Sequence, residues 1–232
     1  GADIADTDPQ RTGLTPVPAA ATGAEPESDR TAAIVQGVLD QVREILADEP
    51  QANSFLARGF AAFTPYPTFE TRYGLRAVAV ARYPMYRGVA SLVGMAVEGV
   101  PDSNEGSVEM LERHFGAYDF YFIHFKDTDS RGHDGDFEGK VTAIEEVDAL
   151  LPRIRELGAD VLIVTGDHST PALYKEHTWH HVPTLVASDW ARPSAEVFGE
   201  SSCRLGELGV VPGKDLMSLA LAHAVRLDKY GA

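Results

Sequence analysis

The stretch Phe122-Ile-His-Phe-Lys-Asp-Thr-Asp-Ser-Arg-Gly-His-Asp-Gly-Asp136 decides the fold of this chain. It begins inside an apolar run, residues 118–125, that predicts a buried strand. Four aspartates, one histidine and two glycines follow within ten residues. A second stretch, Asp160-Val-Leu-Ile-Val-Thr-Gly-Asp-His-Ser-Thr-Pro171, repeats this design with an Asp-His pair after a buried strand. Because ligands in open α/β sheets bind beyond the carboxyl ends of the strands, the two stretches predict hard metal ligands at one sheet edge.

The first candidate ligands are Asp129 and His133, which lie four residues apart on a turn that enters a helix. At this spacing they share one helix face. A carboxylate with an imidazole suits zinc or manganese better than calcium. The alternative is that Asp129 caps the helix and His133 is a surface residue. Asp167 and His168, which leave the second strand after Gly166, are the stronger pair, because a strand end less often carries a histidine without a function.

A third imidazole would complete a zinc or manganese site with one open position. His177, His180 and His181 are all close enough in the sequence to the second strand, and their spacing does not distinguish among them. The chain is also dense in arginines for an acidic protein. Arg58, Arg72, Arg76, Arg82 and Arg87 suit a phosphorylated or carboxylated substrate, although solvated surface charge explains each of them singly.

The composition limits the classes of partner that the chain can bind. The 232 residues include 20 Lys and Arg and 35 Asp and Glu, for a formal net charge of −15. Such a surface repels nucleic acid and anionic membranes, so we expect neither as a partner. No run of about 18 apolar residues predicts a transmembrane helix. Cys203 is the single cysteine, which precludes an internal disulfide and fits a reducing cytoplasm.

Strands alternate with helices along the later part of the chain. We expect strands near 75–81, 96–100, 118–125, 160–165 and 182–187, and helices near 29–47, 85–94, 105–115, 138–157 and 215–227. This alternation predicts an α/β fold with a mostly parallel, doubly wound sheet. The irregular sequence before about residue 70 gives way to alternating strands and helices, so we place a domain boundary there.

The motifs resemble those of the archaeal-type 2,3-bisphosphoglycerate-independent phosphoglycerate mutases of the alkaline phosphatase superfamily. The matching segments run from end to end of the chain, and the Gly-His-Asp-Gly-Asp and Gly-Asp-His-Ser-Thr-Pro pieces are the most specific. They lie at residues 6–9, 57–59, 72–77, 86–90, 94–95, 126–136, 165–171, 175–177, 182–183 and 213–217.

The resemblance implies two divalent metal ions, manganese or zinc. Asp129, His133 and His177 would hold one ion, while Asp167 and His168 would hold the other together with an Asp and a nucleophilic Ser. The Ser would take the phosphoryl group of 3-phosphoglycerate and return it to the other hydroxyl, a glycolytic reaction. The resemblance places four residues at the substrate: Arg58, Arg87, Lys126 and Asp8.

The resemblance also implies an alkaline-phosphatase-like core, whose sheet is flanked by helices, with an inserted cap domain. Residues 1–70 would be the later part of the cap, and residues 71–232 the later part of the metal-binding core. Asp127 stands where the family usually has glycine. The nucleophile and its neighbouring Asp have no counterpart among the 232 residues. We therefore expect a fragment that lacks the first strands of the core and is inactive alone.

Missing strands would leave a sheet edge and apolar surface exposed, so we expect self-association. Three alternatives remain open from the sequence. In the first, the parent protein is another metal-dependent phosphomonoesterase or phosphonate enzyme of the superfamily. In the second, the chain is a truncated paralogue that binds metal without catalysis, and in the third, the fragment is an α/β body that binds no metal.

Overall fold

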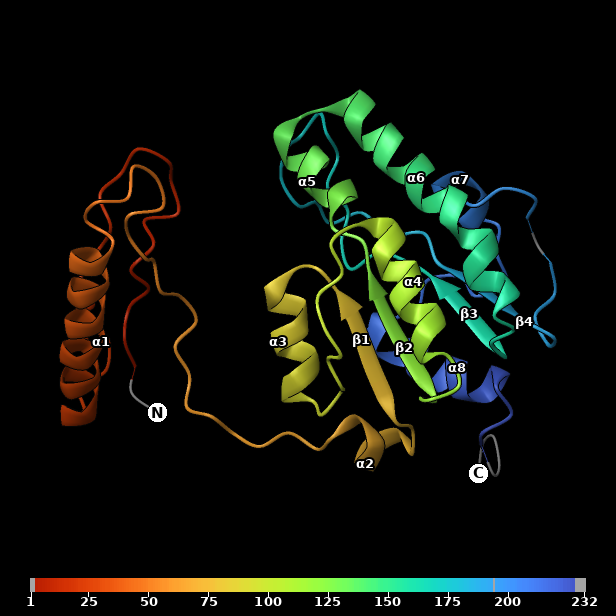
Figure 1. The fold of residues 1–232 in the computed structure, drawn as a ribbon, viewed down its shortest axis with the longest axis horizontal. Coiled ribbons are helices and arrows are strands. Elements are labelled where there is room, and N and C mark those ends of the chain that lie inside the picture. The colour runs from red at the N-terminus through yellow and green to blue at the C-terminus, as the bar shows by residue number, and fades with distance from the viewer. Residues whose placement is uncertain (1–2, 194, 228–232) are drawn as a thin grey trace. The chain divides into compact units, whose positions relative to one another are not determined.

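The computed structural model describes residues 3–193 and 195–227. The chain divides into two compact units, Gly1–Pro65 and Tyr66–Ala232. Figure 1 shows the elements of each unit along the colour scale. No helix of the described residues combines the length and the apolar character that a membrane span requires.

The first unit is built on helix α1, Pro26–Ile45, and the extended segments beside it. The N-cap of this helix is Glu25, and Pro26 follows it because proline carries the φ angle that a first helical position needs. Ser28 is buried, and its hydroxyl accepts a hydrogen bond of 3.1 Å from the amide of Asp3. Thr7, also buried, joins the segments at residues 7 and 57 through the backbone of Ala57.

The second unit contains the strands. Strands β1, Ala77–Ala81, and β2, Phe120–His124, form a parallel pair. Helices α3, Pro84–Leu92, and α4, Asn104–His114, lie between them in the sequence. Strands β3, Val161–Val164, and β4, Leu185–Ser188, form a separate antiparallel pair. Figure 1 shows both pairs with helices beside them.

The predicted mostly parallel sheet is therefore found only in part, since the described strands form one parallel and one antiparallel pair. A parallel pair needs a long crossover, and α3 with α4 supplies one between β1 and β2. Residues 165–184 contain no helix, so the chain turns back and β4 runs antiparallel to β3. The strand expected near 96–100 is reduced to a single bridge between Val78 and Ala96. The α/β class itself is confirmed.

Two clusters form the interior of this unit. Val108 and Leu111 of α4 pack against Leu150 and Ile154 of the long helix α6, Phe137–Glu156. Phe69 of the short helix α2, Phe69–Tyr73, packs with Leu75 and Ala77 in the second cluster. That cluster also includes side chains of helix α8, Leu216–His223. The remaining short elements are α7, Glu200–Cys203, and the single turn Gly213–Asp215.

The element that positions the candidate ligands is helix α5, Asp127–Asp134. It starts directly after β2 and ends at Gly135, whose φ of 73° suits glycine at a helix C-terminus. Asp136 then caps α6, because its carboxylate accepts a 2.9 Å hydrogen bond from the amide of Gly139. The N-cap of α5 is Lys126, so Asp129 lies in the first turn and does not cap the helix.

Candidate metal centre

The stretches at residues 122–136 and 160–171 meet through a close backbone contact. Gly132 of α5 is buried, and the position of an added Cβ would overlap the carbonyl oxygen of Thr170. Only glycine allows this approach. It brings the first turns of α5 against residues 167–171, which follow β3. Ligands that lie about 40 residues apart in the sequence thus share one location.

Asp129 lies at the centre of the candidate ligands, and 14% of its side chain is exposed. Its Oδ1 atom is 3.6 Å from Nε2 of His133 and 3.8 Å from Nε2 of His177. The same oxygen is 3.8 Å from Nδ1 of His168. Ligand atoms of Asp129, His168 and His177 all lie within 4.8 Å of one another.

His133 and His177 approach each other through their Nε2 atoms, which are 3.1 Å apart. Nδ1 of His133 lies 3.0 Å from the carbonyl oxygen of Lys175. Because a carbonyl oxygen only accepts, Nδ1 of His133 carries a proton, which leaves Nε2 as the atom with the lone pair. This is the arrangement that a metal-binding histidine normally has, with its far nitrogen bound to a protein acceptor.

Asp167 and His168 form a second set. Oδ2 of Asp167 lies 3.4 Å from Nε2 of His168. The hydroxyl of Tyr86, from α3, donates a hydrogen bond to the same carboxylate oxygen. Two ligand atoms at about 2.1 Å from one tetrahedral ion are about 3.4 Å apart. The separations in both sets are close to this value, and Asp129, His168 and His177 form one candidate site for a divalent ion. The ring of His168 stacks on that of His177 with centroids 3.6 Å apart, which places the two sets side by side.

Both carboxylates are held in their charged form. Burial alone would raise the pKa of Asp129, but hydrogen bonds from Lys126 and Thr170 and nearby positive charges lower it to about 2. Burial opposes the shift of Asp167 too, and the hydrogen bond from Tyr86 helps to lower the pKa of that carboxyl. Two ionised carboxylates beside several imidazoles form a donor set for divalent cations.

We expect the metal-free protein to lose stability in two steps as the pH falls. Burial lowers the pKa of His124 below 6.5, so the unfolded state gains the proton first and stability declines below about pH 6.5. The folded pKa of Asp129 is about 2, against an ordinary 3.8. Its contribution is therefore complete above about pH 4 and disappears between about pH 4 and pH 2. Urea unfolding with EDTA across this range measures both steps. If Asp129→Asn left the lower step unchanged, this assignment would be wrong.

The residues expected at the substrate are placed as follows. Lys126 donates to the carboxylate of Asp129, and its ammonium lies 5.1 Å from the ring centroid of Tyr83. Arg87 belongs to α3, and its buried Nε atom has no hydrogen-bond partner among the described residues. The carboxylate of Asp127 pairs with Arg82 at 3.2 Å.

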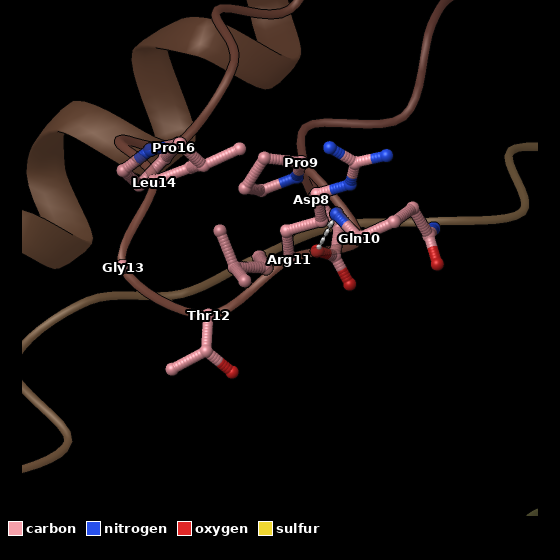
Figure 2. A pocket seen from close by; sticks show the side chains of 9 residues that line it. Asp8, Pro9, Gln10, Arg11, Thr12, Gly13, Leu14 and Pro16 are labelled. Carbon is pink, nitrogen blue, oxygen red and sulfur yellow. Dashed lines mark hydrogen bonds between the residues drawn. The ribbon is translucent and has the colours of Figure 1, made fainter. Parts of the chain in front are cut away.

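The other two expected residues, Asp8 and Arg58, pair within the first unit, where Nε of Arg58 lies 3.4 Å from Oδ2 of Asp8. Figure 2 shows the pocket that Asp8 lines, where the amide of Gln10 donates a 2.8 Å hydrogen bond to Oδ1 of Asp8. The pocket is lined by residues 8–14, Pro16 and Leu56. Of the remaining arginines, Arg76 forms a surface ion pair with Asp119, as the simpler interpretation expects.

Sequence reasoning missed three residues of the centre. Tyr86 and Thr170 stand inside matching motifs, but they had no assigned role. His124 ends β2, is half-buried, and stacks on Tyr86 with ring centroids 3.8 Å apart. The signal available for all three was their position within one or two residues of a strand end or a matching motif.

The chain matches a family of known proteins and several of their members. Residues 53–223 match the Metalloenzyme superfamily. A probable 2,3-bisphosphoglycerate-independent phosphoglycerate mutase of Thermus thermophilus is 48% identical over 236 residues, which cover 100% of this chain and 58% of that protein. The corresponding protein of Deinococcus radiodurans is 47% identical over 236 residues and is covered to 57%. The chain thus spans little more than half the length of these relatives.

Two solved structures resemble this one. A protein of Pyrococcus horikoshii matches with a TM-score of 0.68 and 28% identity over 77% of this chain and 56% of that chain. A cofactor-independent phosphoglycerate mutase of Thermoplasma acidophilum matches with a TM-score of 0.61 over 95% of this chain and 59% of that chain, and its 24% identity supports the fold alone. The expected resemblance is confirmed, since the chain is homologous to the later part of the archaeal-type mutases. With a matched region of 171 residues, from 53 to 223, the chain belongs to the Metalloenzyme superfamily.

Proposed function

We propose that this chain is the metal-binding part of a 2,3-bisphosphoglycerate-independent phosphoglycerate mutase, which interconverts 3- and 2-phosphoglycerate. The observation that carries the proposal is the convergence of two strand ends on one ligand cluster, with Asp129 within 3.8 Å of three imidazoles. The homology to mutases over the whole chain supports the substrate.

In this proposal Asp129, His133 and His177 hold one manganese or zinc ion, and Asp167 and His168 hold the other. The ions supply positive charge that stabilises a transferring phosphoryl group. Hydrogen bonds from neighbouring side chains orient these ligands and keep both carboxylates ionised. Lys126 and Arg87 lie on the segments that follow β2 and β1, at the carboxyl ends of the parallel pair, and bind the phosphoryl oxygens.

We also propose roles for the two parts of the chain. Residues 1–70 are the later part of a substrate-binding cap, in which Arg58 and Asp8 bind the glycerate, and residues 71–232 belong to the phosphatase-like core. The exposed charge of Arg58 supports this role. The resemblance places no serine of residues 1–232 at the nucleophile position, so we expect these residues alone to bind metal and phosphoglycerate without isomerising it.

Titration of this chain with Mn²⁺ or Zn²⁺ by calorimetry tests the proposal. We expect the unsubstituted chain to bind the metal tightly. We expect His177→Ala to weaken the affinity by about 10-fold to 100-fold, because Nε2 of His177 lies close to both Nε2 of His133 and Oδ1 of Asp129. The matched control is His181→Ala, which removes an exposed imidazole from the same loop and should leave the affinity unchanged.

Equal affinities for the two histidine variants would contradict the ligand assignment. Binding of metal together with hydrolysis of phosphate monoesters, and no isomerisation by a protein that spans the full length of the related mutases, would indicate a phosphomonoesterase instead.

A further inference from the structure

Thr170 is a buried polar residue that touches both ligand sets. It is 5% exposed, and it follows β3 by six residues. Its hydroxyl oxygen lies 2.6 Å from Oδ1 of Asp129 and 3.0 Å from Nδ1 of His168. Asp129 belongs to the first proposed set and His168 to the second. One hydroxyl therefore bridges the two halves of the candidate centre.

The direction of the two hydrogen bonds follows from the number of protons. An ionised carboxylate only accepts, so the single proton of the Thr170 hydroxyl is donated to Asp129. The hydroxyl oxygen then offers only lone pairs to His168. Nδ1 of His168 must therefore carry a proton and donate it, which leaves Nε2 as the atom free to bind a metal ion. Nε2 is also the atom that faces Asp167, at 3.4 Å.

We propose that Thr170 is a positioning residue that fixes the tautomer of His168 and links the orientation of Asp129 to that of His168. This inference rests on the proposed function, because it concerns the same centre. It adds a residue that holds two ligands of the centre through one hydroxyl. Hydrogen-bond partners of metal ligands commonly set the ring orientation and the basicity of those ligands.

The backbone around Thr170 restrains the hydroxyl. The carbonyl oxygen of Thr170 lies against Gly132, so the residue is seated on α5. The amide of Thr178 donates a 2.9 Å hydrogen bond to the carbonyl oxygen of Ser169, and the amide of Lys175 donates one of equal length to Pro171. These contacts close the segment 169–178 into a loop. Removal of the hydroxyl should therefore alter the positions of both ligands, because the loop is held too firmly to compensate by moving.

The test compares two substitutions of Thr170 with a matched control. Thr170→Val keeps the shape and removes the hydroxyl, whereas Thr170→Ser keeps the hydroxyl. Thr178→Val makes the same change in the same loop, at a hydroxyl that contacts His180 and none of the proposed ligands. Two quantities are measured for each protein: the tautomer of His168 by ¹⁵N NMR of the metal-free chain near pH 8, and the affinity for Mn²⁺ and Zn²⁺ by calorimetry.

We expect His168 to be protonated at Nδ1 in the unsubstituted chain and in Thr170→Ser. In Thr170→Val the proton should redistribute between the two nitrogens, and the metal affinity should fall by about 10-fold to 100-fold. Thr170→Ser should stay within about 3-fold of the unsubstituted chain, and Thr178→Val should change neither quantity.

The outcomes separate this inference from the proposed function. A His168 protonated at Nε2 in the unsubstituted chain would overturn the inference without any variant, even if Thr170→Val failed to fold. Unchanged tautomer and affinity in a folded Thr170→Val would overturn it as well. If the unsubstituted chain bound no metal while His168 carried its proton on Nδ1 and lost this preference in Thr170→Val, the metal assignment would fail and the positioning role would stand.

Discussion

Asp129→Asn is expected to weaken the binding of Mn²⁺ or Zn²⁺ by at least about 100-fold, more than the loss of a residue that only supports a ligand. Asp129 is the residue on which the centre converges, since one carboxylate oxygen lies within 3.8 Å of His133, His168 and His177. Asparagine keeps the shape but removes the negative charge that balances the cation. Calorimetric titration of the two proteins at one pH measures the difference.

The matched control for this substitution is Asp134→Asn. Asp134 lies on the same helix and is exposed, and the same change removes the same charge. We expect its metal affinity to remain within about 3-fold of the unsubstituted chain, because an exposed charge is screened by solvent and salt. If both variants lost affinity equally, the net acidity of α5 and not a specific ligand would explain metal binding.

Gly132→Ala is expected to destabilise the second unit by about 3 kcal/mol, at the upper end of the range for overpacked sites. The added methyl group would overlap the carbonyl oxygen of Thr170, which belongs to the backbone and has little room to move. Separation of α5 from the loop at 169–178 would relieve the overlap. It would also pull Asp129 away from His168 and Thr170, so metal binding should weaken together with stability. Urea unfolding measures the free energy, and calorimetry measures the affinity.

Gly88→Ala provides the contrast. Gly88 lies within α3, and an added Cβ would meet nothing within 4 Å. Alanine favours a helix over glycine by about 1 kcal/mol, so this variant should be slightly more stable than the unsubstituted chain. A loss below about 1 kcal/mol for Gly132→Ala would mean that the contact between α5 and Thr170 does not hold the two stretches together.

Much of the local structure was predictable from the sequence. The apolar runs before Lys126 and Gly166 are strands, and helices near residues 105–115 and 138–157 were placed within about one residue of their observed ends. These features depend on near neighbours. A cap such as Ser103, which accepts a 2.9 Å hydrogen bond from the amide of Gly106, involves residues three apart. The motifs also identified which segments carry ligands.

The sheet was less predictable. The alternation of strands and helices indicated parallel pairing, and β1 with β2 follows it. The pairing of β3 with β4 depends on how the chain crosses from residue 165 to residue 184, and that segment has no periodic pattern to read. The direction of β4 was therefore decided by the tertiary structure.

By itself, the sequence determined the elements and the candidate ligands, because strand, helix and cap signals act over a few residues. It could not choose among His177, His180 and His181 by spacing. Only the tertiary structure places Nε2 of His177 at 3.1 Å from His133. It alone also joins Thr170 to Asp129, 41 residues apart, and Tyr86 to Asp167, 81 residues apart. Such contacts arise from the packing of whole elements against one another, so no local pattern of residues contains them.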